Sequence, residues 1–194
     1  MRRSIVLLLL FLATACGHVG FHPREVNGYL SGGKSLSNFH GHSIFHTVQF
    51  ELAGESALSK RWLRTPDAGV SVSYNDIRQA RSWFGYRYGD PSDSVRAVSS
   101  YFFLRHFWRQ SSDIEPYTEL GTGPMWSNRR VPAATSRFNF NSQLGLGAVL
   151  FPRSRMPLHV GYRFSHISNG GSEGRNPGLE VHQIVIGTRL MRLR

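Results

Sequence analysis

The sequence predicts an all-β fold, an eight-stranded antiparallel transmembrane β-barrel. Apolar and polar residues alternate in one run after another, which is typical of strands because successive side chains point to opposite faces. No apolar run after residue 16 reaches the ~18 residues that a membrane-spanning helix needs. The first residues are typical of exported proteins. An apolar content of 40% is also too high for a disordered chain.

The N-terminal segment, residues 1–15, is predicted to be a secretory signal peptide. Arg2 and Arg3 precede an unbroken apolar run from Ile5 to Leu12, and small residues close it. The single cysteine of the chain, Cys16, stands where a lipobox cysteine is acylated and becomes the mature N-terminus. We therefore expect lipidation at Cys16, with ordinary cleavage nearby as the alternative.

The segment after the signal peptide, residues 16–40, indicates a tether that contains a weak first strand near Val26–Ser31. It is rich in glycine and serine, and its alternation is poor. The barrel is therefore assigned to residues 41–194, with a start near residue 26 as the other boundary that the pattern permits.

The clearest strand covers Ser136–Phe151. Its even positions carry Phe138, Phe140, Leu144, Leu146, Ala148 and Leu150, while its odd positions are polar or small. Turn signals separate the other runs that we expect to be strands, and these are Ser43–Leu52, Gly69–Tyr74, Trp83–Tyr88, Arg96–Arg109, Ile114–Trp126, Pro157–Ser168 and Leu179–Met191. Together with the weak first strand these runs make about eight strands, whether Gly69–Tyr74 and Trp83–Tyr88 are taken as one strand or as two.

The formal net charge of +11 is carried almost wholly by arginine, since Lys34 and Lys60 are the only lysines. Arginine suits bidentate contacts with phosphate. Nucleic acid is not expected as a partner of an exported chain, so an anionic lipid surface is favoured. A solvated basic rim would give the same composition.

Two adjacent strands bring three chemically useful side chains to one end of one face. His166 and Ser168 end the even, apolar face of Pro157–Ser168, and Glu180 opens the same face of Leu179–Met191. A hairpin that joins these strands sets both ends at the same level of the membrane. Histidine could then take the proton of the serine hydroxyl, and the carboxylate could orient the imidazole.

The connecting loop supplies hydrogen-bond donors for an oxyanion. Asn169 and Asn176 have side-chain amides, and Gly170 and Gly171 expose backbone N–H groups. Polar residues on a lipid-facing surface cost several kcal/mol unless they are paired, so their placement by chance is disfavoured.

These residues resemble the motif of a known family. His166-Ile167-Ser168-Asn169, followed by Asn176-Pro177-Gly178 and Glu180, is similar to the lipid A 3-O-deacylase (PagL) family of outer-membrane acyl hydrolases. That family has a His-x-Ser-Asn motif at a strand end, an asparagine about ten residues after the histidine and a glutamate fourteen after it. Asn176 and Glu180 stand at these spacings, and the close match covers about 159–190.

The resemblance implies an eight-stranded outer-membrane barrel with a Ser/His/Glu triad that faces lipid. It also implies a metal-independent serine esterase, without a cofactor, that removes the 3-position acyl chain of lipid A in lipopolysaccharide. Ser168 would be the nucleophile, His166 the base and Glu180 the orienting acid. Asn169 and Asn176 would serve the oxyanion site or its scaffold.

Two competing sites are weaker. His40, His42 and His46 share one strand parity, but three imidazoles along one strand spread over ~20 Å at ~3.3 Å per residue, too far for one ion. No metal is therefore expected. Glu173 is a second carboxylate near the triad, and it ranks below Glu180 because it lies in the middle of the loop.

Other functions remain open from the sequence. One is a non-catalytic outer-membrane barrel of structural or adhesive use, and another is a phospholipase with the same triad. A third is a soluble periplasmic lipoprotein barrel that binds an apolar ligand, whose oily face would point inward. The sequence also leaves a homodimer open.

Overall fold

The computed structural model describes ten stretches of the chain. They are residues 21–36, 42–56, 66–79, 82–83, 86–87, 94–108, 113–132, 135–174, 176 and 178–193. The predicted signal peptide, Cys16 and the first residues of the predicted tether lie outside these stretches. In the described stretches no helix is long and apolar enough to cross a membrane.

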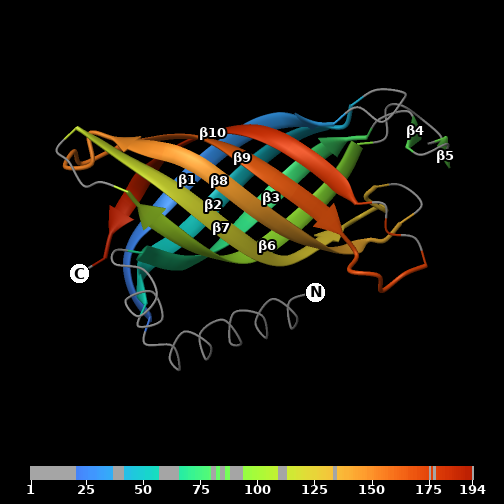
Figure 1. The fold of residues 1–194 in the computed structure, drawn as a ribbon, viewed down its shortest axis with the longest axis horizontal. Helices are drawn as coiled ribbons and strands as arrows, with labels where there is room; N and C mark the ends of the chain where they lie inside the picture. The colour runs from blue at the N-terminus through green and yellow to red at the C-terminus, as the bar shows by residue number, and fades with distance from the viewer. Residues whose placement is uncertain are drawn as a thin grey trace.

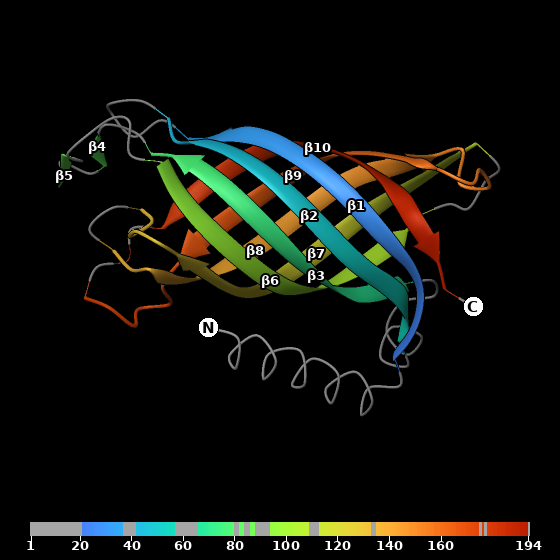
Figure 2. The same cartoon turned by 180° about the vertical axis from the view of Figure 1, so that it is seen from behind.

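Eight long strands form a closed antiparallel barrel (Figures 1 and 2), as the sequence predicted. The strands of the barrel are β1 (Phe21–Ser35), β2 (Ile44–Ser56), β3 (Pro66–Arg78), β6 (Ser94–Phe107), β7 (Ile114–Ser127), β8 (Phe138–Leu150), β9 (Leu158–Ser168) and β10 (Leu179–Arg192). Their order around the barrel is β1-β10-β9-β8-β7-β6-β3-β2, so the first and last strands close it.

Two parts of the chain differ from the sequence-based expectation. The segment 16–40, assigned to a tether, contains the complete strand β1, and the barrel begins at Phe21 rather than near residue 26 or 41. Glycines interrupt the alternation of apolar and polar residues in this strand. The neighbouring strand leaves no room for a side chain at Gly33, since a Cβ there would lie 1.9 Å from the carbonyl oxygen of His182. The run Trp83–Tyr88 adds no barrel strand, because β4 (Ser82–Trp83) and β5 (Tyr86–Arg87) form a separate two-stranded sheet.

The barrel is polar inside and apolar outside. Buried inward positions include Gln49, Glu51, Asn75, Ser99, Arg105, Glu119, Asn141, Gln143, Arg163 and Gln183. Exposed outward positions include Leu30, Val48, Phe50, Val72, Leu120, Leu144, Leu146, Ile184 and Ile186. An apolar outer surface around a polar interior is the pattern of a membrane barrel. The alternative of a soluble barrel, which requires the apolar face of each strand to point inward, is therefore wrong.

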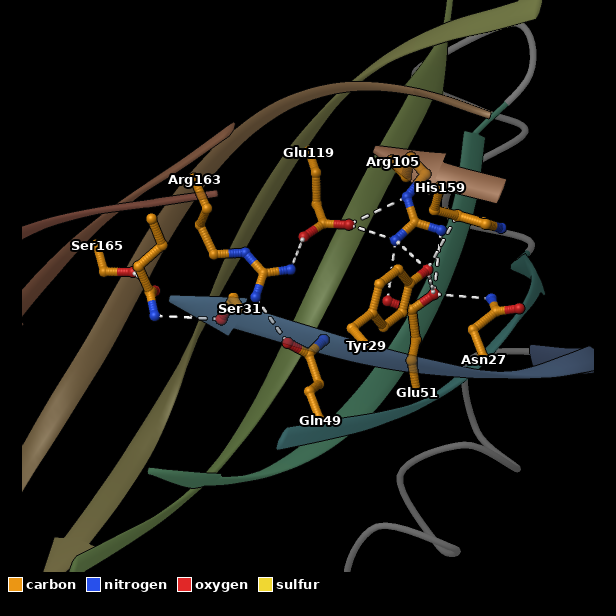
Figure 3. Close-up of polar contacts among 11 residues, drawn as sticks. Asn27, Tyr29, Ser31, Gln49, Glu51, Arg105, Glu119, His159, Arg163 and Ser165 are labelled. Carbon is orange, nitrogen blue, oxygen red and sulfur yellow. Dashed lines mark hydrogen bonds and ion pairs between the residues drawn. The ribbon is translucent and has the colours of Figure 1, made fainter. Parts of the chain in front are cut away.

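Charged side chains fill the middle of the barrel (Figure 3). Arg105 donates from Nη1 and Nη2 to the carboxylate of Glu51 at 3.0 and 2.9 Å, and from Nε to Glu119 at 3.0 Å. Arg163 donates to Glu119 Oε1 at 3.3 Å and to Gln49 Oε1 at 2.6 Å. Two arginines thus balance two glutamates, and no charge in this cluster is left without an opposite partner.

This ion-pair cluster should contribute strongly to stability. We expect Arg105→Met to lower the free energy of unfolding by about 3–5 kcal/mol, because it leaves buried carboxylates without their partner. Urea unfolding of the barrel in lipid vesicles, followed by tryptophan fluorescence, measures this. Arg24→Met is the matched control, since Arg24 is exposed and pairs with Glu55 at the surface, where a pair is worth at most about 1 kcal/mol. Equal losses in the two variants would contradict the expectation.

One end of the barrel, named here the loop end, is where β9 finishes and β10 begins. Its connections are 36–43, 79–93, 128–137 and 169–178, whereas the opposite end holds the start of β1 and the finish of β10. A buried apolar cluster closes the interior at the loop end, and it contains Phe45, Ile77, Val95, Ala97, Met125, Val131, Ile167, Leu179 and Val181. Ile167 and Leu179 are cross-strand partners. They anchor the strand ends that carry His166 and Glu180 on the opposite face.

Candidate active site

His166 and Glu180 form the centre of the site. They lie directly opposite each other on β9 and β10, and His166 Nδ1 lies 3.0 Å from Glu180 Oε1. Both side chains are on the outer face, where 43% of the His166 side chain and 32% of that of Glu180 are accessible. The period-2 pattern predicted this meeting, because it gives the two residues the same face and the hairpin gives them the same level.

Gly178 gives room to the histidine ring. Its backbone has a φ of +71°, and a Cβ on it would lie 2.6 Å from His166 Cε1 and 3.4 Å from Nε2. The ring therefore lies against Gly178, with Nδ1 held by Glu180 and the Cε1–Nε2 edge directed toward the loop end. In the sequence Gly178 stands out only as part of a motif, and its contact with the histidine ring was not predicted. An Asn-Pro-Gly turn directly before a strand is the signal that pointed to a special backbone position.

Ser168 lies beyond His166 on the same face of β9, at the last residue of the strand. Its cross-strand neighbour on β8 is Phe140, and the register of β9 with β10, continued by one pair, sets Gly178 on its other side. Two residues along a strand span roughly 7 Å. Among the described residues, no hydrogen bond joins the Ser168 hydroxyl to His166. To make one, the Ser168 side chain would have to rotate toward the Nε2 edge of the His166 ring.

The connecting loop is held by its two asparagines. The buried side chain of Asn169 accepts a hydrogen bond from the Gly171 N–H at 2.9 Å, and Asn176 Oδ1 accepts one from the Asn169 N–H at 3.0 Å. The Ser172 hydroxyl donates to the Asn169 carbonyl at 2.8 Å. Gly170 and Gly171 both have a positive φ, of +63° and +82°, which glycine adopts readily. These contacts give both asparagines a part in shaping the loop beside Ser168.

Glu173 points to a different partner. Its Oε1 accepts a hydrogen bond from the Ser136 hydroxyl at 3.2 Å, which links the loop after β9 to the connection before β8. The carboxylate that contacts His166 is that of Glu180.

Two polar pairs beside the site were not found from the sequence. Ser142 lies opposite His166 on β8, and its hydroxyl lies 2.9 Å from that of Thr122 on β7. On the other side, the Tyr162 hydroxyl is hydrogen-bonded to His182 Nδ1. All four residues are at even positions, so parity put them on the outer face. Only the strand register shows that Ser142 lies beside His166, with Thr122 one strand further, and that His182 lies two residues along β10 from Glu180.

The three-histidine alternative gains no support. His42 Nδ1 donates to the Ser35 carbonyl at 2.6 Å, and His40 lies outside the described residues. Within the stretches that the structure describes, no group of three or more His, Cys, Asp or Glu side chains could hold a metal ion.

Comparison with known proteins points to one family. The sequence model of the family described as "Lipid A 3-O-deacylase (PagL)" matches residues 46–189, well over half of the chain. The lipid A deacylase PagL of Bordetella bronchiseptica is 35% identical over 74 residues. The aligned part is 35% of this chain and 38% of that protein, so the chain spans well under half the length of this curated relative.

Two solved structures share the fold. The crystal structure of the outer membrane enzyme PagL has a TM-score of 0.64 at 15% identity, over 83% of this chain and 97% of that one. The crystal structure of Neisserial surface protein A has a TM-score of 0.61 at 13% identity, over 88% of this chain and 97% of that one. At such identities the likeness concerns the barrel fold alone.

Proposed function

This chain belongs to the lipid A 3-O-deacylase (PagL) family, a family of ester hydrolases of the outer membrane, and we propose that it removes the ester-linked 3-position acyl chain of lipid A. We further propose that Ser168, His166 and Glu180 act as its catalytic triad. The observation that carries the proposal is the hydrogen bond between His166 and Glu180 on the lipid-facing surface. A histidine–carboxylate pair on the lipid-facing surface lowers the stability of the barrel. Its presence there therefore favours a functional role.

In the proposed reaction Ser168 Oγ attacks the carbonyl carbon of the acyl ester, and its proton passes to His166 Nε2. Collapse of the tetrahedral intermediate breaks the bond to the sugar oxygen, which takes that proton and leaves as a hydroxyl. Water then attacks the acyl-enzyme carbonyl with His166 as base, the bond to Ser168 Oγ breaks, His166 returns the proton to that oxygen, and a free fatty acid departs. Glu180 keeps the proton of the neutral imidazole on Nδ1 and stabilises the imidazolium.

The oxyanion of the intermediate needs donors near Ser168. Asn176 and the backbone of Gly170 are the groups that we assign to this task. Asn169 and Gly171 are assigned to the loop scaffold, because the Gly171 N–H is already donated to Asn169 Oδ1.

The substrate should enter sideways from the outer leaflet. The proposed triad lies on the outer face of the barrel, while ion pairs and the apolar cluster occupy the interior. Lipid A is therefore the substrate that suits a site at the loop end, if that end is extracellular. The arginines of the loops and rim would hold its phosphates.

The orientation of the barrel can be tested by labelling. We expect Ser172→Cys to react with an impermeant thiol reagent on intact cells, because Ser172 is exposed in the connection at the loop end. A chain without the new cysteine controls for reaction at Cys16. If labelling occurred only after the outer membrane was opened, the site would face the periplasm. The physical argument for lipid A as the substrate would then fail.

The activity itself is tested by mass spectrometry of lipid A after incubation with the purified barrel in detergent and a chelator. The expected result is the loss of one ester-linked acyl chain, and unchanged lipid A would refute the proposal. Release of fatty acid from phospholipids but not from lipid A would assign the same triad to a phospholipase. Ser154→Ala, at an exposed turn on the opposite end of the barrel, is a matched control that should keep full activity.

A further inference from the structure

A row of polar side chains crosses four neighbouring strands on the outer face. Thr122 on β7 is opposite Ser142 on β8, Ser142 is opposite His166 on β9, and His166 is opposite Glu180 on β10. The proposed mechanism uses only the last two of these residues. The hydroxyls of Thr122 and Ser142 lie 2.9 Å apart, and Thr122 is exposed on the outer face of the barrel.

Apart from His166, which lies opposite Ser142, the large neighbours of this hydroxyl pair are apolar. Phe140 and Leu144 flank Ser142 along β8, Leu120 precedes Thr122 on the same face of β7, and Phe102 is its partner on β6. A hydroxyl in such surroundings is favourable only when it has a hydrogen-bond partner. The two hydroxyls satisfy each other in part, since each has one donor proton and two acceptor lone pairs.

The pair lies farther from the loop end of the barrel than the proposed catalytic pair. Thr122 and Ser142 are five and four residues from the loop-end termini of their strands, whereas His166 is two residues from the end of β9 and Glu180 is one from the start of β10. A bound lipid has its sugar headgroup above the ester and its acyl chain below it. Any polar group that meets the hydroxyl pair must therefore belong to the acyl chain.

We propose that the Ser142–Thr122 hydroxyl pair recognises an oxygen substituent on the scissile acyl chain and so determines the substrate specificity. The inference rests on the proposed function and adds to it two residues and a feature of the substrate. Ser142 lies diagonally across from Ser168, a separation of roughly 7–8 Å between Cβ atoms. That distance suits a carbonyl carbon at Ser168, two further chain carbons and an oxygen hydrogen-bonded to Ser142.

The test compares two esters of one phosphorylated glucosamine, which carry chains of equal length with and without a hydroxyl two carbons beyond the carbonyl. The readout is the ratio of kcat/KM for the hydroxylated chain to kcat/KM for the plain chain. We expect the wild-type protein to favour the hydroxylated chain by about tenfold, as one hydrogen bond permits. Thr122→Val and Ser142→Ala should each bring the ratio close to one. Thr118→Val, on the same face of β7 but further from the loop end, should leave it unchanged.

A third ester, whose chain oxygen is itself acylated, tells whether the pair donates to an ester oxygen or requires a free hydroxyl. An unchanged ratio in Thr122→Val and Ser142→Ala would overturn the inference while the proposed function stood. Equal slowing of both esters would also overturn it, because the hydroxyls would then act through His166. If the wild-type protein cleaved no ester and no lipid A, both proposals would fail. The mobility of unheated protein in detergent gels checks that each variant forms the barrel.

Discussion

Ser168→Ala and His166→Ala should each abolish deacylation of lipid A while the barrel still assembles. Either change removes an indispensable partner from the proposed proton transfer, and loss of a triad serine or histidine lowers kcat by about four to six orders of magnitude. Glu180→Ala should cost about a hundredfold less than either, because a carboxylate orients and stabilises the imidazole but does not carry the proton. Single-turnover assays with the purified variants measure these losses.

Because these residues point outward, their substitution should affect the activity without affecting the assembly of the barrel. None of the three side chains belongs to the buried ion-pair cluster or the apolar cluster, so heat-modifiable gel mobility should be the same as for the wild-type protein. Deacylation by Ser168→Ala at the wild-type rate would remove Ser168 as the nucleophile. Ser142, the other hydroxyl beside His166, would then be the next candidate. Full activity in Glu180→Ala would remove the carboxylate from the site.

Gly178→Ala should lower kcat by at least about a hundredfold without unfolding the barrel. The new Cβ would lie 2.6 Å from His166 Cε1, so the ring must move away from Glu180 and Ser168. A displacement of about 1 Å in a catalytic group can cost this much. Steady-state kinetics should show the loss in kcat more than in KM, because the change acts on the proposed base.

Gly171→Ala is the matched control for Gly178→Ala. Both glycines have a positive φ, of +82° and +71°, so both substitutions carry a similar backbone cost of roughly 1–2 kcal/mol. A Cβ at Gly171, however, meets no atom within 4 Å. Similar activity in the two variants would mean that backbone strain, and not contact with His166, accounts for any loss.

Much of the proposed site could be predicted because it depends on local rules. A period of two residues gives His166, Ser168 and Glu180 one face, and a single hairpin brings them to one end, so neither inference needs a distant part of the chain. The positions of Gly178, Ser142 and Thr122 relative to His166 could not be predicted. They follow from the register between strands and from the direction of a ring, which sequence spacing does not contain.

The first strand and the interior show the same division. Glycines that approach neighbouring backbone, such as Gly33, weaken the alternation of β1, so its sequence resembles a tether although it closes the barrel. Arg105 and Glu51 are 54 residues apart in the chain, and only barrel closure makes them an ion pair. Nothing in either residue's neighbourhood in the sequence identifies the other.

The sequence by itself determined the class of fold and the face of the strands that carries the proposed triad, since strand geometry alternates whatever the rest of the chain does. That the apolar face points outward was decided by the tertiary structure, in which the inward positions are polar. The tertiary structure alone decided where the barrel begins, which strands pair and in what register, and how the interior charges are neutralised. It also decided which polar side chains border His166. These features depend on contacts between residues that are distant in sequence, and such contacts exist only once eight tilted strands have closed on one another.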